Sequence, residues 1–194
     1  MNDDTRFSHL VSLACHDLRT PLATVFGFAR TISRADGLDP TLVGYSEMIE
    51  TASQQLAELV DELSLATRIA GGRYEARLEG VGTVELASAA AEQLGAERVG
   101  VSGDGGDVSV DVEATKRSVS ALVQCALRHG GLDRVEVVAE GPELRVTPIT
   151  PASAPVVLGE DLRDLGAAVA VMHIGHIGGS VAVDGETLTI RLPS

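Results

Sequence analysis

The sequence predicts an α+β protein with a helical N-terminal part and a sheet-containing C-terminal part. Two observations lead to this fold class. From Phe7 to Ala70, apolar residues recur at alternating spacings of three and four, the period of packed helices. After Gly71 and Gly72 this period gives way to short alternating runs separated by turn residues, which are typical of strands. We therefore expect one domain over residues 1–72 and a second over residues 73–194.

The N-terminal part is predicted to be two long helices joined by a short loop. Gly37 and Pro40 mark the end of the first helix and the start of the second. Long helices joined so closely form an antiparallel hairpin. The spacing defines an apolar seam along each helix: Phe7, Val11, Ala14, Leu18, Pro21, Val25, Phe28 and Ile32 in the first, and Leu42, Tyr45, Ile49, Ala52, Leu56, Leu59, Leu63, Ala66 and Ala70 in the second.

Both helices carry further apolar residues beside the seam, such as Leu22, Phe26 and Val60. One hairpin cannot bury two apolar stripes on each helix. A symmetric homodimer, in which two hairpins form a four-helix bundle, is the simplest arrangement that covers both. The alternative is that the second stripe packs on the C-terminal half of the same chain.

The C-terminal part is predicted to be an α/β sandwich with helices on one face of a mixed sheet. Helices are expected from Thr83, acting as the N-cap, to Leu94, and over residues 113–129 and 161–177. Strands are expected over 74–81, 98–101, 108–112, 135–139, 144–147, 180–183 and 187–192. The proline-rich stretch 148–155 has neither period.

Composition and charge restrict the partners and the compartment. A net charge of −13 argues against nucleic acid or an anionic membrane surface as the partner. No apolar run approaches the ~18 residues of a membrane span, and the N-terminus lacks the layout of a signal peptide. We therefore expect a cytoplasmic protein without membrane insertion. Cys15 and Cys125 lie in predicted helices without CxxC spacing, so no disulfide, zinc site or other metal site is indicated.

His16 is the main candidate for a reactive group. It lies two residues before the seam position Leu18, which turns it about 200° away from the seam and toward solvent. A neutral imidazole offers one unprotonated nitrogen as a nucleophile. Asp17 can orient the ring or accept its proton, and Thr20, one turn later, can position a water with its hydroxyl. An ordinary exposed helix histidine remains the alternative from these residues alone.

The helix face around His16 is also a candidate docking surface. His9 shares this face, and the small residues Ala23 and Gly27 leave a shallow surface on which another protein could approach closely. We take Arg19, Ala23 and Gly27 as candidate partner-binding residues.

The run FSHLVSLACHDLRTPL, residues 7–22, resembles the dimerisation and phosphoacceptor motif of sensor histidine kinases. The resemblance implies that His16 is the phosphoacceptor, that Asp17 assists phosphoryl transfer and that Thr20 assists dephosphorylation. It also implies a partner: the receiver domain of a response regulator, which would bring its own aspartate and Mg²⁺.

The C-terminal part is similar to the ATP-binding domain of these kinases, with departures at the nucleotide site. The family's magnesium-holding asparagine is matched by Cys125, a soft ligand that suits Mg²⁺ poorly. Residues 148–155 replace its first glycine box and contain no carboxylate and no glycine. In place of the second box, Glu160, Asp161 and Asp164 would repel phosphates. ATP is therefore not expected to bind, and no cofactor of the chain's own is predicted.

Three functions remain open. The favoured one is a histidine phosphotransferase of a phosphorelay, which passes a phosphoryl group between His16 and receiver aspartates. The second is a divergent ATP-dependent sensor histidine kinase that autophosphorylates His16; the short segment before the phosphoacceptor helix and the altered nucleotide boxes weigh against it. The third is a receiver phosphatase working through Thr20, or a scaffold.

Two smaller features are expected to be structural. His173 and His176, three residues apart near a helix end, should pack or cap rather than bind a metal. Gly103, Gly105 and Gly106 should form a turn between short strands.

Overall fold

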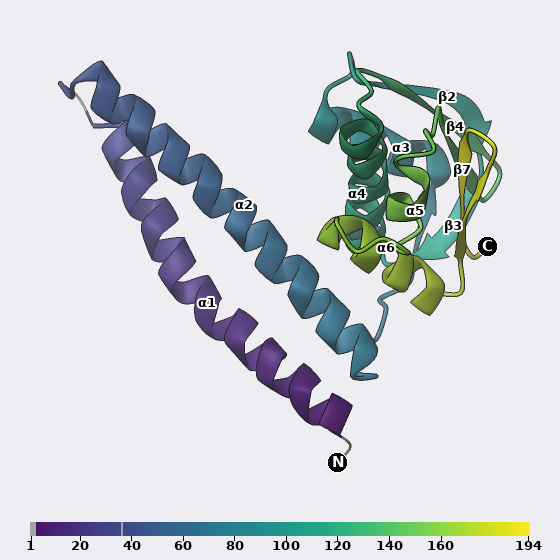
Figure 1. Ribbon diagram of the computed structural model, residues 1–194, viewed down its shortest axis with the longest axis horizontal. Helices are drawn as coiled ribbons and strands as arrows, with labels where there is room; N and C mark the ends of the chain where they lie inside the picture. Colours follow the sequence, from purple (N-terminus) through teal and green to yellow (C-terminus); the bar gives the residue numbers. More distant parts are fainter. Residues whose placement is uncertain (1–2, 36) are drawn as a thin grey trace. The chain divides into compact units, whose positions relative to one another are not determined.

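The protein consists of two compact units, Met1–Arg73 and Tyr74–Ser194. The computed structural model describes residues 3–35 and 37–194, and for residues 3–10 it describes the backbone alone. The side chains of Phe7 and His9, named above, therefore lie outside the described part. Figure 1 shows a two-helix hairpin in the first unit and a sheet with helices in the second, which confirms the predicted fold class.

The first unit is a hairpin of α1 (Asp3–Ser33) and α2 (Pro40–Ala70). Asp39 caps α2 by accepting a hydrogen bond from the amide of Thr41 at 2.8 Å, and Pro40 occupies the first turn, where its missing N–H costs nothing. The Thr41 amide holds the pKa of Asp39 below its usual value. At the other end, the amide of Gly71 donates to the carbonyl of Thr67. No helix in the described part of the chain is long and apolar enough to span a membrane.

The residues that the hairpin buries lie beside the predicted seam rather than in it; of the predicted second stripe, Val60 is buried, while Leu22 and Phe26 are half-buried. Cys15 and Ala29 of α1 are buried, as are Ser46, Ser53 and Val60 of α2. Most of these side chains are small, so the two helices approach closely. The seam itself is uncovered, with residues between 45% and 67% exposed: Leu18, Val25, Phe28, Ile32, Leu42, Tyr45, Ile49, Leu56 and Leu59.

The second unit is built on a five-stranded mixed sheet of order β2-β4-β5-β7-β6. Its strands are β2 (Val99–Gly105), β4 (Val135–Glu140), β5 (Glu143–Thr147), β6 (Ser180–Asp184) and β7 (Thr187–Arg191). β2 and β4 pair in parallel, and the other neighbours pair antiparallel. Two further strands, β1 (Glu79–Gly82) and β3 (Asp107–Val110), form a separate two-stranded sheet.

Helices α3 (Thr83–Leu94), α4 (Val112–Gly130) and α6 (Leu165–His176) cover one face of the larger sheet, and the short α5 (Ala154–Val157) lies near α4 and α6 (Figure 1). Leu86 of α3 and Leu122 of α4 pack with sheet residues such as Val137, Leu144 and Ile190, all of them fully buried. This is the only large core among the described residues of the second unit.

Several boundaries differ from the prediction. Thr83 is not an N-cap: Gly82 takes that place, and the Thr83 hydroxyl bonds the carbonyl of Gly141 and the amide of Gly106. Helix α6 begins at Leu165, four residues later than predicted, because Asp164 caps it. Gly103 and Gly105 belong to the end of β2, with a register shift between them, and only Gly106 forms the predicted connection between the strands β2 and β3.

Candidate functional site

His16 and Asp17 lie side by side on the surface of α1. Nδ1 of His16 is 3.2 Å from Oδ1 of Asp17, and their side chains are 77% and 70% exposed. A carboxylate at this distance favours the tautomer that carries its proton on Nδ1. Nε2 then holds the free lone pair and faces solvent. The pair therefore presents one nucleophilic nitrogen and one carboxylate that compensates charge developing on the ring.

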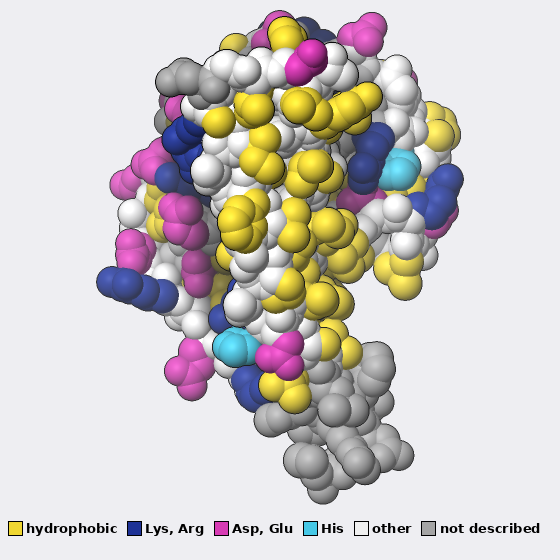
Figure 2. All heavy atoms as spheres, turned by 90° about the vertical axis from the view of Figure 1, so that its left-hand side faces the viewer, with side chains coloured by type: hydrophobic (Ala, Val, Ile, Leu, Met, Phe, Trp, Pro, Cys, Tyr) yellow, Lys and Arg dark blue, Asp and Glu magenta, His cyan; other side chains and the backbone are white. Residues whose placement is uncertain are grey.

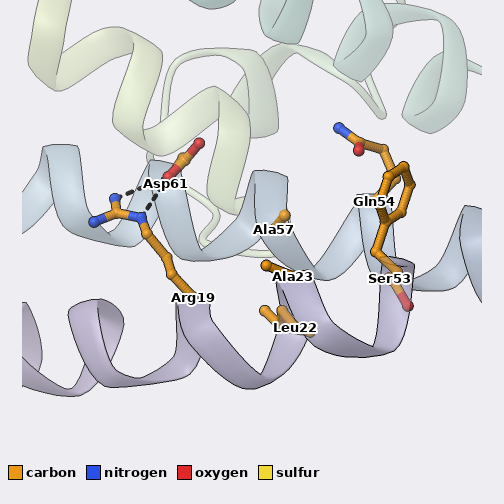
Figure 3. Close-up of a pocket in the computed structure, with 8 residues that line it drawn as sticks. Arg19, Leu22, Ala23, Ser53, Gln54, Ala57 and Asp61 are labelled. Carbon is orange, nitrogen blue, oxygen red and sulfur yellow. Dashed lines mark hydrogen bonds and ion pairs between the residues drawn. The ribbon is translucent and has the colours of Figure 1, made fainter. Parts of the chain in front are cut away.

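Thr20 and Arg19 follow within one turn of His16. Thr20 is exposed, at the i+4 position from His16, so both side chains lie on the same side of α1. Arg19 instead reaches across the hairpin to α2. Its Nε and its terminal nitrogen both donate to Oδ1 of Asp61, at 3.1 and 2.8 Å (Figure 3). Arg19 thus links α1 to α2 in the structure. Its contact with a partner protein stays a prediction.

Ala23 and Gly27 lie further along α1 and are both exposed. A Cβ atom at Gly27 would meet no heavy atom of the described residues within 4 Å, so the surface there is open. Ala23 lines a groove of about 270 Å³ between α1 and α2. Figure 3 shows the Arg19–Asp61 pair at one end of this groove and Gln54 at the other. The remaining lining residues are Leu22, Phe26, Ser53 and Ala57.

The uncovered seam runs past the same segment of α1. Figure 2 shows hydrophobic side chains in a strip along the hairpin, formed by the exposed seam residues named above. Leu18, two residues after His16, belongs to this strip. A contiguous exposed apolar strip of this kind marks an interaction surface.

The second unit holds a compact polar cluster on α4 and at the start of α6. Oδ2 of Asp164 accepts a hydrogen bond from Arg128 and lies 3.1 Å from Nε2 of His129, while Oδ1 accepts from the amide of Ala167 at 3.1 Å. Burial raises the pKa of Asp164, but the bonds from Arg128 and Ala167 outweigh it and hold the pKa below its usual value. Of the three acidic residues predicted to repel phosphates, Asp164 is thus turned inward and paired, while Glu160 is exposed.

Cys125 belongs to the same cluster. Its sulfur, a nitrogen of His129 and a carboxylate oxygen of Asp164 lie within 4.8 Å of one another. Cys125 is fully buried, and burial together with the nearby Asp164 charge raises the pKa of its thiol to about 12. Sequence reasoning placed Cys125 and Asp164 separately and did not use His129. The i, i+4 spacing of Cys125 and His129 was the available signal, but Asp164 joins them only through the fold.

The residues at this place do not fit a magnesium–nucleotide group. A buried thiol stands where Mg²⁺ would need a hard oxygen ligand. The segment after β5 carries Ile149, Val156 and Val157 into the hydrophobic core, where all three are at most 1% exposed. In this chain, apolar side chains and an internal ion pair occupy the positions that the sequence resemblance assigns to the nucleotide site.

A buried hydrogen-bonded chain connects α4, α6 and the first residue of the second unit. Nδ1 of His173 lies 3.0 Å from the Ser118 hydroxyl, and its Nε2 lies 3.3 Å from the Tyr74 hydroxyl. His176 places Nε2 3.2 Å from the carbonyl of Tyr74. These contacts confirm the structural role predicted for both histidines.

Comparison with known proteins agrees with the geometry of both units. Residues 8–72 match the His Kinase A (phospho-acceptor) domain. The chain is 36% identical over 74 residues to the sensor histidine kinase TrcS of Mycobacterium tuberculosis. The matched region covers 37% of this chain and 14% of TrcS. It is 28% identical over 173 residues to the sensor protein DivL of Caulobacter vibrioides. The matched region covers 84% of this chain and 21% of DivL.

Residues 8–72 therefore belong to the His Kinase A (phospho-acceptor) domain family. Solved structures support the fold: full-length ShkA in complex with AMPPNP matches 94% of this chain and 44% of its own length, with a TM-score of 0.68 and 17% identity. The ATP-binding domain of PrrB from Mycobacterium tuberculosis matches 61% of this chain and 98% of its own length, with a TM-score of 0.50 and 19% identity. The chain spans about a fifth or less of the length of TrcS and DivL.

Proposed function

We propose that this protein is a histidine phosphotransferase of the histidine kinase type, which carries a phosphoryl group on Nε2 of His16 and exchanges it with aspartates of receiver domains. The observation that supports this most directly is the His16–Asp17 contact of 3.2 Å. It leaves Nε2 free for attack and places a carboxylate beside the ring.

The transfer step follows from this arrangement. The Nε2 lone pair attacks the phosphorus of a receiver aspartyl phosphate and forms an N–P bond. The bond between phosphorus and the aspartate oxygen breaks, and its electron pair returns to the receiver carboxylate. The ring becomes positively charged, and Asp17 stabilises it through the Nδ1 proton. Transfer to a second receiver is the reverse of these events, and any Mg²⁺ comes with the receiver.

ATP has no part in the proposed reaction. The chemistry of Cys125 and the packing of Ile149, Val156 and Val157 favour a phosphoryl donor other than a nucleotide. The alternative is a divergent kinase that autophosphorylates His16 with ATP as the phosphoryl donor.

The proposal includes a homodimer. A second hairpin would cover the seam residues that each chain leaves 45–67% exposed and would complete a four-helix bundle. The receiver would dock beside His16, with Ala23 and Gly27 as candidate contacts, because the small side chains leave the helix surface open.

A second candidate function is receiver dephosphorylation through Thr20. The exposed Thr20 hydroxyl one turn from His16 favours it. A hydroxyl at that place can orient a water toward an aspartyl phosphate docked on the same face.

The test uses receiver domains encoded in the same genome. They are first phosphorylated with acetyl phosphate, and the remaining acetyl phosphate is then removed. Intact mass of the full chain is then followed after mixing. We expect a phosphoryl-sized gain on the wild type without ATP, none on His16→Ala, and a slower gain on Asp17→Asn. His176→Ala, an exposed histidine away from the motif, should behave like the wild type.

Two results would overturn the proposal. One is transfer that persists in His16→Ala. The other is a gain on the wild type from Mg²⁺ and ATP with no receiver present, which would make the protein a kinase.

A further inference from the structure

The cluster on α4 and α6 has the composition of a metal site. A thiol, an imidazole and a carboxylate converge from Cys125, His129 and Asp164, with their ligand atoms within 4.8 Å of one another. Zn²⁺ prefers sulfur, nitrogen and carboxylate ligands in a tetrahedral arrangement. Ligands held at bond lengths of ~2.0–2.3 Å in such a site lie about 3.5 Å apart. Nε2 of His129 and Oδ2 of Asp164 are already 3.1 Å apart, so a small adjustment of the side chains would be sufficient.

The backbone already fixes the three residues relative to one another. Cys125 and His129 are four residues apart on α4 and so share one face of the helix. Asp164 is the N-cap of α6, held by the Ala167 amide through Oδ1, which leaves Oδ2 directed at His129. Both Cys125 and Asp164 are buried, while His129 is partly exposed and gives an ion a route of entry.

Arg128 now supplies the positive charge that the buried carboxylate needs. Its guanidinium donates to Oδ2 of Asp164, and its side chain is 62% exposed. An exposed arginine can turn into solvent at little cost because its charge is then hydrated. It therefore acts as a cation that a metal ion can replace.

We propose that Cys125, His129 and Asp164 bind one Zn²⁺ per chain, with Arg128 displaced and a water as the fourth ligand. Zn²⁺ takes the place of the thiol proton of Cys125, which leaves to solvent, and accepts a lone pair from the Nε2 or Nδ1 atom of His129. A thiolate, a carboxylate and a divalent cation sum to zero charge, so the buried cluster is neutral in both states. The ion would tie α4 to the start of α6.

The experiment titrates the full, chelator-treated chain with Zn²⁺ in calorimetry, and with Co²⁺ while recording the near-ultraviolet thiolate-to-metal absorption band. We expect one equivalent bound, the thiolate band in the wild type, and a rise in the melting temperature with Zn²⁺. Loss of even an outer-shell partner costs about 10–100-fold in metal affinity, so Cys125→Ser should weaken binding by at least that much and abolish the band.

Control variants separate this site from others on the chain. Cys15→Ser removes the other cysteine, which lies on α1, and should leave the affinity and the band unchanged. Arg128→Gln removes the competing cation and should tighten binding. His129→Asn gives a second ligand variant if Cys125→Ser does not fold.

The proposal is wrong if the wild type binds no Zn²⁺, in which case the cluster is an ion pair only. It is equally wrong if the affinity and thiolate band survive in Cys125→Ser or in His129→Asn.

Discussion

The Tyr74 hydroxyl donates a hydrogen bond to Oδ2 of Asp111 at 2.7 Å, and Oδ1 of the same carboxylate caps helix α4 at the amide of Ala114. Asp111 therefore fixes both the beginning of α4 and the first residue of the second unit. Burial raises the pKa of Asp111, but the bonds from Tyr74 and Ala114 outweigh it and hold the pKa below its usual value. The carboxylate is charged at neutral pH and accepts both bonds.

Replacing Tyr74 by Phe should destabilise the second unit. The change removes the hydroxyl that lies between Asp111 and His173, and it leaves the half-buried carboxylate of Asp111 and the buried ring of His173 without this partner. We expect a loss of about 1–3 kcal/mol in the free energy of unfolding, measured by urea titration. Tyr45→Phe, at a tyrosine on α2 outside the second unit, should leave the unfolding transition of the second unit unchanged and serves as the control. A Tyr74→Phe variant as stable as the wild type would contradict the importance of the bond.

The free energy of unfolding should fall as the pH drops from about 6.5 to about 4. Burial, with help from Arg117 and His176, lowers the pKa of His173 to about 4, against the pull of Asp111. The unfolded chain takes up this proton near pH 6.5 and the folded chain only near pH 4, so acid favours unfolding in that window. The expected loss is about 3 kcal/mol.

Urea titrations at several pH values check this dependence. His173→Gln removes the titrating group and should flatten the profile between pH 6.5 and 4. If the free energy of unfolding of His173→Gln fell just as steeply with pH, another group would be responsible for the pH dependence.

Leu56→Glu should separate the proposed dimer. Leu56 is a seam residue, 51% exposed in the single chain, and a carboxylate there would lose its hydration in the dimer interface. We expect the dissociation constant to rise at least about tenfold, measured by light scattering over a dilution series. Gln55→Glu adds the same charge at the neighbouring exposed position and should have little effect. Equal behaviour of the two variants would place the interface elsewhere.

Thr20→Ala should retain transfer to His16 but slow the loss of phosphate from the receiver. Without the hydroxyl, the water that attacks the aspartyl phosphate is less well oriented. We expect the rate of receiver dephosphorylation to fall by up to about tenfold. Release of inorganic phosphate from a phosphorylated receiver measures this. An unchanged rate would remove Thr20 from the reaction, and a loss of transfer as well would indicate damage to docking.

The sequence predicted the helices and strands well because their period depends on local spacing. The seam from Leu42 to Ala70 and the turn at Gly37 and Pro40 determine the hairpin with no knowledge of distant contacts. The choice of stripe buried within the hairpin was harder. Ser46 and Ser53 do not look like core residues in a sequence, yet their small size lets α1 and α2 pack closely.

Features made by distant residues could not be predicted. The group of Cys125, His129 and Asp164 depends on the crossing of α4 and the start of α6, which no local period encodes. The same holds for Thr83, whose hydroxyl bonds Gly141 from 58 residues away instead of capping its own helix. The contact between His16 and Asp17 was predictable because the two residues are adjacent.

The small, partly polar contact between α1 and α2 has a consequence for how the protein melts. Serine and alanine side chains bury little apolar area, so a lone hairpin gains little free energy from its internal packing. If a second copy supplies the missing burial, mass action makes the thermal transition of the hairpin depend on protein concentration. The second unit encloses its own core, so its transition should stay at one temperature. A calorimetric scan of a dilute sample should then separate into two peaks that merge as the protein is concentrated.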